Sequence, residues 1–202
     1  MLGAAAQAPG NPNLNAQLLV GARQGELAQV ERVLDQGAAP NARNRVGKTA
    51  LWIASEKGLL AMVERLLAAG ADVNQASLDG VTPLSAASYA GRAEVVRRLL
   101  VAGARTEPLD RMNKPAVVYA AGQGRTAVLE ALLDAGVGVD ASYEHGLTAL
   151  MWAAGQGQVD AVRLLLARHA RVELRDDRGW SAVDIARETG HTELLPLLLA
   201  AP

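Results

Sequence analysis

The chain of 202 residues contains no cysteine and no phenylalanine, and it has only three tryptophans and three tyrosines. Without cysteine it can form no disulfide and no thiolate metal site, and it has no cysteine nucleophile. With so few aromatic residues, the hydrophobic core must be built from aliphatic side chains and alanine. Twenty basic residues nearly balance 21 acidic ones, and no apolar run reaches the length of about 18 residues that a membrane span needs. We therefore expect neither a nucleic-acid partner nor insertion into a membrane.

Glycine returns at a fixed spacing of 33 residues along almost the whole chain. The first series consists of Gly25, Gly58, Gly91, Gly124, Gly157 and Gly190. A second series comprises Gly37, Gly70, Gly103 and Gly136, followed by His169 in place of glycine. A third comprises Gly47, Gly80, Asn113, Gly146 and Gly179. Because asparagine is the next residue most tolerant of positive φ, we expect backbone geometry to fix these positions, and His169 to be left-handed like the glycines it replaces. A fixed period of this length indicates one small unit repeated along the chain.

Two short helices are predicted within each period. The first begins after a Thr or Ser cap in four of five periods, as in TALWIASEKG (49–58) and TPLSAASYAG (82–91). The second is an amphipathic stretch such as AEVVRRLLVAG (93–103). A polar loop follows the second helix. Small residues on the first helix allow neighbouring units to stack closely, and these are Ala54, Ala87, Ala120, Ala153 and Ala186.

The 33-residue period, the segment TPLSAASYAG and the segment GADVN (70–74) resemble the ankyrin repeat, over residues 13–200. The resemblance implies an all-α solenoid of stacked L-shaped units, each with two antiparallel helices and a projecting β-hairpin-like loop. We expect one domain, residues 13–202, with six repeats. Their approximate bounds are 13–44, 45–77, 78–110, 111–143, 144–176 and 177–202.

The chain departs from the family pattern at the histidine that usually follows Thr-Pro-Leu. The five corresponding positions hold Trp52, Ser85, Val118, Met151 and Asp184. The Thr–His hydrogen bond of the family is therefore expected to be absent throughout, and stability to rest on packing. In the fourth repeat Pro115 stands where the others have Thr or Ser, which predicts that this repeat is the least stable.

Both ends of the chain are expected to be atypical. Residues 1–12 have no amphipathic period and are predicted to be a flexible segment. Their alanine run followed by Gln7, Ala8 and Pro9 is similar to the end of a bacterial export signal. We favour a periplasmic or exported bacterial protein, with an ordinary cytoplasmic N-terminus as the alternative. In the last repeat Leu197 stands where other repeats have arginine. That face either ends the stack or supports self-association, so we expect a monomer or a weak homo-oligomer.

Catalytic and metal-binding patterns are missing. The three histidines fall at different phases of the repeat, with His145 at a loop tip, His169 at a helix end and His191 at a helix start. No HExxH motif and no phosphate-binding GKS or GKT motif occurs. We therefore predict no enzyme activity, no metal site and no cofactor. Asp110 and Asp176 are instead expected to anchor their loops by bonding backbone N–H groups.

A binding surface is predicted at the positions that packing between repeats leaves free, namely the loop tips and the exposed end of the first helix. Together they form a concave groove suited to a partner protein that has an acidic patch beside a hydrophobic one. Tyr89, Met112 and Trp180 are the expected anchors. By contrast, we expect Trp152 to face the core, and Trp52 and Met151 to fill space between repeats. The candidate contact residues are Arg45, Lys48, Lys57, Leu78, Val81, Tyr89, Arg111, Met112, Lys114, Gln123, His145, Leu147, Gln156 and Trp180.

Overall fold

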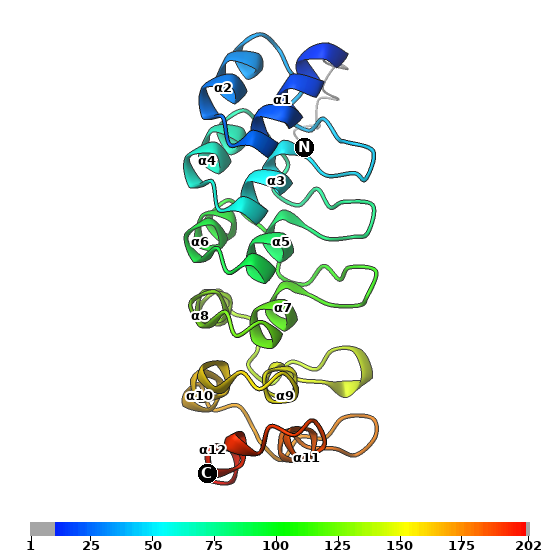
Figure 1. The fold of residues 1–202 in the computed structure, drawn as a ribbon, viewed down its shortest axis with the longest axis vertical. Helices are drawn as coiled ribbons and strands as arrows, with labels where there is room; N and C mark the ends of the chain where they lie inside the picture. The colour runs from blue at the N-terminus through cyan, green and yellow to red at the C-terminus, as the bar shows by residue number, and fades with distance from the viewer. Residues whose placement is uncertain (1–10, 201–202) are drawn as a thin grey trace, which may run out of the picture.

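The computed structural model describes residues 11–200 as a row of stacked helix pairs (Figure 1). The inner column, beside the loops, contains α1 (Pro12–Gln24), α3 (Ala50–Lys57), α5 (Pro83–Ala90), α7 (Ala116–Gly122), α9 (Ala149–Gly155) and α11 (Ala182–Glu188). The outer column contains α2 (Leu27–Asp35), α4 (Leu60–Ala68), α6 (Ala93–Val101), α8 (Thr126–Asp134), α10 (Val159–Ala167) and, after the 3-10 turn η2 (Thr192–Leu194), α12 (Leu195–Leu199). The all-helical solenoid expected from the sequence is confirmed.

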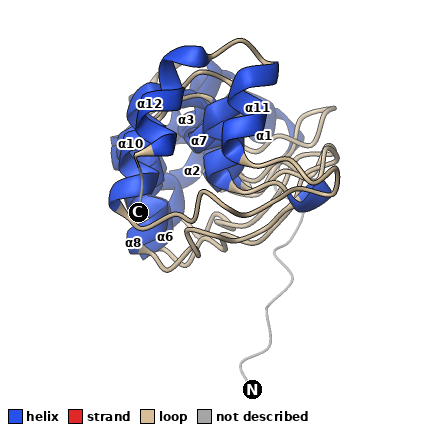
Figure 2. Ribbon diagram, turned by 90° about the horizontal axis from the view of Figure 1, so that it is seen from below, coloured by secondary structure: helices blue, strands red, loops and turns tan. Residues whose placement is uncertain are grey.

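The loops between helix pairs project to one side as a third layer, which Figure 2 shows from the end of the stack. Residues 11–200 contain no β-strand, and only two isolated bridges, Arg43 with Thr49 and Ser142 with Thr148, mark the hairpin character of these loops. The loop between α8 and α9 carries the 3-10 turn η1 (Glu144–Gly146). Below, each loop is called a hairpin.

The first helix begins earlier than expected. Asn11 caps α1, because its side-chain oxygen accepts a hydrogen bond from the Asn13 N–H at 2.9 Å, and Pro12 is the first helical residue. The predicted flexible segment 1–12 is therefore wrong at these two residues. Residues 1–10, which carry the signal-like features, lie outside the described residues.

Side-chain caps start four inner helices as predicted. Thr49, Thr82, Thr148 and Ser181 each accept a hydrogen bond from the backbone N–H three residues further on. Pro115 precedes α7 and supplies no such bond, which agrees with the expectation of a weaker fourth repeat.

Two residues at the missing histidine position bind the cap hydroxyl after all. Ser85 Oγ lies 3.1 Å from Thr82 Oγ1, and Ser181 Oγ donates to Asp184 Oδ2 at 2.7 Å. In the third and sixth repeats a short hydroxyl or carboxylate therefore bonds to the cap in place of the family's imidazole, so stability there does not rest on packing alone.

Alanine sets the distance between repeats. All five alanines predicted on the stacking face of the inner helices are completely buried. The outer helices contribute larger aliphatic side chains, such as Val63, Val96 and Leu165, to the same continuous core. Because each helix pair contacts only its neighbours, the core runs the length of the stack.

A row of side-chain hydrogen bonds ties each hairpin base to the next repeat. The Asn41 Oδ1 accepts from the Asp72 N–H at 2.7 Å. One repeat further on, the Asn74 Oδ1 accepts from the Arg105 N–H at 2.9 Å. Between the fourth and fifth repeats, Asp140 Oδ1 accepts from the Arg171 N–H, also at 2.9 Å.

This row is interrupted between the third and fourth repeats. Glu107 occupies the bridging position there, and the described chain has no bond from it to Gly138. The next residue supplies the reason. In other repeats the N–H at that point closes a turn, as from Gln75 to the Asp72 carbonyl at 3.2 Å, but Pro108 has no N–H and holds the preceding residue extended. A hollow of about 330 Å³ opens at the gap, with Glu107 and Tyr143 among its lining residues.

The C-terminal face differs from the sequence expectation in one residue. Leu197 packs partly against the core, whereas Leu199 of the same helix has 63% of its surface exposed. Leu199 is therefore the apolar residue that α12 presents to solvent. Self-association through this face stays a prediction.

His169 has φ of 62°, in the left-handed region that glycine occupies at the same point of other repeats. Because its side chain is exposed, we expect His169→Gly to stabilise the fold by about 1 kcal/mol. Chemical denaturation monitored by circular dichroism measures this. The matched control is Gly136→His, one repeat earlier, which should destabilise by a similar amount. A less stable His169→Gly protein would contradict the proposed strain.

The interrupted row predicts a second stabilising change. Glu107→Asn combined with Pro108→Ala restores both the turn-closing N–H and the bridging amide, and we expect a gain of about 1 kcal/mol in the free energy of unfolding. Glu107→Asn alone should change little, since Pro108 still keeps the turn open. Hydrogen exchange of the Gly138 amide should slow only in the double variant, and equal protection in the two proteins would refute this explanation.

Candidate functional site

Three adjoining hollows follow the surface between the inner helices and the hairpins, and together they are called the groove below. The central hollow, of about 290 Å³, is lined by Tyr89, Met112, Lys114, Val118, Tyr119, Gly122, Gln123, Trp152 and Gln156. The N-terminal hollow, of about 210 Å³, is lined by Trp52, Glu56, Val81, Ser85, Ala86, Tyr89 and Tyr119. The C-terminal hollow, of about 170 Å³, is lined by Leu147, Met151, Trp152, Gly155, Gln156, Arg178, Ile185 and Thr189.

The hollows share their walls, which makes the groove continuous over five repeats. Tyr89 and Tyr119 belong to both the N-terminal and the central hollow. Trp152 and Gln156 belong to both the central and the C-terminal hollow. Aromatic side chains thus separate one hollow from the next. The core behind them is mainly aliphatic.

The middle of the groove is held rigidly by Asp110. One carboxylate oxygen accepts hydrogen bonds from the backbone N–H groups of Met112 and Lys114, at 2.9 and 3.0 Å. The other accepts a hydrogen bond from the Tyr119 hydroxyl. Burial and this bond raise the pKa of the Tyr119 hydroxyl above its usual value. Asp110 therefore anchors its hairpin as predicted, and it also ties the hairpin to α7, the inner helix that lacks a side-chain cap.

Edge-to-face stacking fixes the two tyrosines relative to each other. The ring centroids of Tyr89 and Tyr119 lie 5.7 Å apart, and the ring planes meet at 83°. Tyr89 nevertheless keeps 52% of its surface exposed. It is therefore an aromatic residue that is both positioned and accessible.

Three cations lie on aromatic faces along the groove. Lys48 Nζ is 3.5 Å from the centroid of the Trp52 ring, Lys114 Nζ is 4.5 Å from that of Trp152, and the Arg178 guanidinium carbon is 4.2 Å from that of Trp180. Two of these cations also face a carboxylate: Lys48 Nζ lies 3.9 Å from Glu56 Oε1, and Arg178 Nη2 lies 2.6 Å from Asp176 Oδ2.

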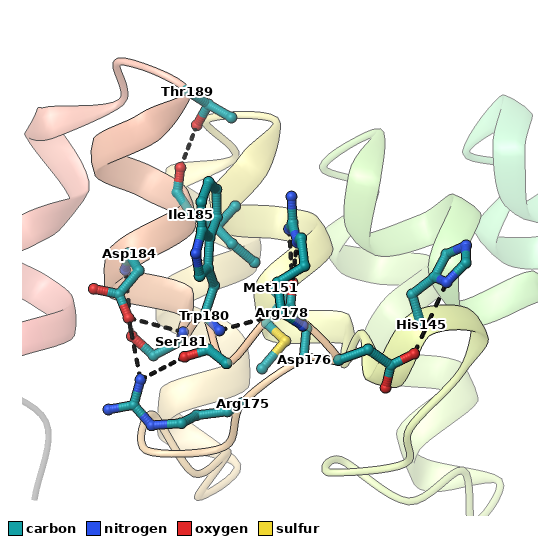
Figure 3. A network of polar contacts seen from close by, with 12 residues as sticks. His145, Met151, Arg175, Asp176, Arg178, Trp180, Ser181, Asp184, Ile185 and Thr189 are labelled. Atoms are coloured by element: carbon teal, nitrogen blue, oxygen red, sulfur yellow. Dashed lines mark hydrogen bonds and ion pairs between the residues drawn. The ribbon is translucent and has the colours of Figure 1, made fainter.

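A polar network holds the last hairpin (Figure 3). The Asp176 Oδ1 accepts hydrogen bonds from the backbone N–H groups of Arg178 and Trp180, at 2.9 Å each, which confirms it as the predicted anchor of this hairpin. Burial alone would raise the pKa of Asp176, but the bonds from Arg178 and from these N–H groups lower it below the usual range. Hydrogen bonds from Ser181, through its N–H and its hydroxyl, likewise lower the pKa of Asp184.

The structure brings half of the candidate contact residues into the groove. Those that line a hollow are Val81, Tyr89, Met112, Lys114, Gln123, Leu147 and Gln156. Lys48 covers the lining residue Trp52. The remaining candidates lie at the rim: Arg45, Leu78, Arg111 and His145 are in the hairpin tips, Lys57 ends α3, and Trp180 lies under Arg178.

One prediction in this region is incomplete. Trp152 does pack against the core as expected, but it is only half-buried, and its remaining surface lies between two hollows, under Lys114. Tyr119 also lines the groove and was missed. These two residues lie 33 apart, so they share a phase on neighbouring inner helices. Trp52 and Met151 are buried as expected, and the Trp52 indole N–H donates to the Val81 carbonyl of the next repeat at 2.9 Å.

No cluster of three or more His, Cys, Asp or Glu side chains suited to a metal ion occurs within residues 11–200. Among the helices of that part of the chain, none has the length and apolar character needed to cross a membrane.

Comparison with known proteins gives a family and a fold. The family model described as "Ankyrin repeats (3 copies)" matches residues 18–111 and 117–202. Among solved structures, the crystal structure of the ankyrin repeat protein EF0377 is similar, with a TM-score of 0.82 and 26% sequence identity over 93% of this chain and 98% of that one. No curated protein matches.

The lowered pKa of Asp176 predicts acid sensitivity of the last hairpin. The stabilisation is complete above the usual aspartate pKa, about 3.9, and is lost as the pH falls through the lower value in the folded protein. Asp176→Asn should therefore destabilise the protein at pH 7 but much less at pH 2.5, as measured by urea denaturation. Asparagine keeps the turn bonds, since Asn44 makes the same two bonds in its own hairpin. An equal effect of the substitution at both pH values would show that the charge has no role.

Proposed function

The chain belongs to the ankyrin-repeat family, and we propose that it is a non-catalytic module that binds a partner protein in the groove. Ankyrin repeats are generally protein–protein interaction modules, and the family is generally non-enzymatic. The family match covers most of the chain. What this chain adds to that general role is the chemistry of its own groove.

The observation that carries the proposal is where the aromatic side chains are placed. Four of the six aromatic residues in the chain line the hollows, namely Trp52, Tyr89, Tyr119 and Trp152. Trp52 is buried and belongs to the core, whereas Tyr89, Tyr119 and Trp152 stay partly accessible. Aromatic side chains in rigid, partly accessible positions are the residues that contribute most to binding energy in protein interfaces.

Exposed apolar residues at the rim extend the same surface. Leu78 and Met112 have 62% and 59% of their surfaces exposed, although both lie in hairpin tips, where folding requires no apolar side chain. A partner that covers the groove would bury them together with Tyr89.

Self-association through α12 is the alternative proposal. Its support is the exposed Leu199 on α12. A single residue is a smaller surface than the groove offers, so we favour a partner of a different kind.

The groove proposal predicts the effect of truncating its aromatic walls. A photo-crosslinking amino acid at position 89 identifies the partner, which is then purified and titrated by calorimetry. Tyr89→Ala and Trp152→Ala should each weaken binding by about 2 kcal/mol or more, about 30-fold in Kd.

Matched controls are Leu109→Ala and Leu199→Ala, which remove exposed apolar side chains away from the groove. Both should bind like the unmodified protein. If the groove substitutions leave binding unchanged but Leu109→Ala weakens it, the interface lies around Leu109 and not in the groove. Loss of dimer in sedimentation with Leu199→Ala would favour self-association instead.

A further inference from the structure

Resting on the proposed function, we infer that the central hollow receives a carboxylate of the partner, carried by a segment in which apolar side chains flank an acidic residue. The carboxylate occupies, beside Lys114, the place that Glu56 occupies beside Lys48 two repeats earlier.

The two lysines stand at the same phase of the repeat, 66 residues apart. Each places its ammonium group on a tryptophan face. In the second repeat the chain supplies the counter-charge, because Glu56 follows Lys48 by eight residues and its carboxylate lies 3.9 Å from the ammonium. In the fourth repeat the residue eight positions after Lys114 is Gly122.

The Lys114 ammonium group is therefore left without an ion pair, although the Asp110 carboxylate binds the Lys114 backbone N–H. Lys114 is half-buried, and no acidic side chain of residues 11–200 lies within ion-pair distance of its ammonium group. The other lining residues of the central hollow are uncharged. A half-buried ammonium group among apolar walls is less hydrated than an exposed one, and this one has no ion pair. The electrostatic attraction between it and an anionic group of a partner is therefore stronger than at an exposed lysine.

Gly122 leaves the space that such a group needs. A Cβ atom there would meet only Gln156 Cγ at 3.8 Å and Trp152 Cε3 at 4.0 Å, which are ordinary contacts. The fold therefore does not require glycine at this position, and glycine is a poor helix former. Gly155, one repeat later, is different, because its Cβ would lie 3.1 Å from Ile185 and so packing restricts it.

The hollows on either side determine the neighbours of the acidic residue. Tyr89 and Tyr119 separate the central hollow from the N-terminal one, and Trp152 separates it from the C-terminal one. Side chains that enter these flanking hollows meet mainly apolar and aromatic walls. The matching ligand is a peptide segment with an Asp or Glu between apolar residues.

The test uses selection from a phage-displayed library of random ten-residue peptides on the full chain. We expect enriched peptides to carry Asp or Glu between apolar residues. A synthetic peptide of the best sequence is then compared with its amide counterpart, in which the acidic residue is Asn or Gln. The amide should bind about tenfold more weakly to the unmodified protein, but nearly equally to Lys114→Gln. An equal loss with both proteins would overturn the inference.

Gly122→Glu supplies the missing counter-charge from within the chain. It should weaken binding of the acidic peptide at least tenfold while leaving the thermal unfolding midpoint unchanged or higher, since glutamate favours the helix. Gly122→Gln fills the same space without charge and should weaken binding of the acidic and amide peptides by the same factor. Unaltered binding to Gly122→Glu would show that the carboxylate sits elsewhere.

The outcomes separate this inference from the proposed function. If the selected peptides lack an acidic residue but Tyr89→Ala abolishes their binding, the inference is wrong and the groove still binds protein. If peptides bind regardless of Tyr89→Ala and Trp152→Ala, both the inference and the groove proposal are contradicted.

Discussion

Each helix pair can bury its apolar faces only against the pairs before and after it, and this constraint decides most of the structure. It explains why the stacking face of every inner helix from α3 onward carries a completely buried alanine, since a larger residue would push two repeats apart. It also leaves one side of the stack, between the inner helices and the hairpins, without any packing duty. A groove can therefore form on that side, because the contacts between neighbouring repeats already stabilise the fold.

Features that repeat with the period could be predicted from the sequence. The glycine series, the Thr and Ser caps and the buried alanines recur 33 residues apart, so one correct assignment fixes them all. Asn113 and His169 could be placed in the left-handed region because they interrupt a glycine series. The anchoring of hairpins by Asp110 and Asp176 followed from the same register.

Features confined to one repeat could not be predicted, because they depend on distances across the stack. The helical phase of Trp152 correctly predicts packing against the core, but it does not show that the other side of the ring lines the groove under Lys114, a residue of the preceding repeat. The bonds of Ser85 and Asp184 to the cap hydroxyl are local, by contrast, and Ser181-x-x-Asp184 is a capping-box pattern that could have been found in the sequence. The missing bond between Glu107 and Gly138 can be recognised only by comparison with the side-chain hydrogen bonds that the other repeats make at the same position. One signal in the sequence would have found Tyr119 and Trp152: two aromatic residues at the same phase in a chain with almost no others.

Comparing repeats within one chain separates what folding needs from what it tolerates. A deviation that has a structural cause gives no reason to infer a function. The open turn beside Glu107 is such a case, because Pro108 lacks the N–H that would close it. Gly122 has no such cause, because a side chain would fit and a better helix former was available. Its effect is local and electrostatic, since it leaves Lys114 facing an apolar hollow without the partner that Lys48 has. In the proposed binding mode, specificity comes from the absence at position 122 of the carboxylate that Glu56 supplies two repeats earlier.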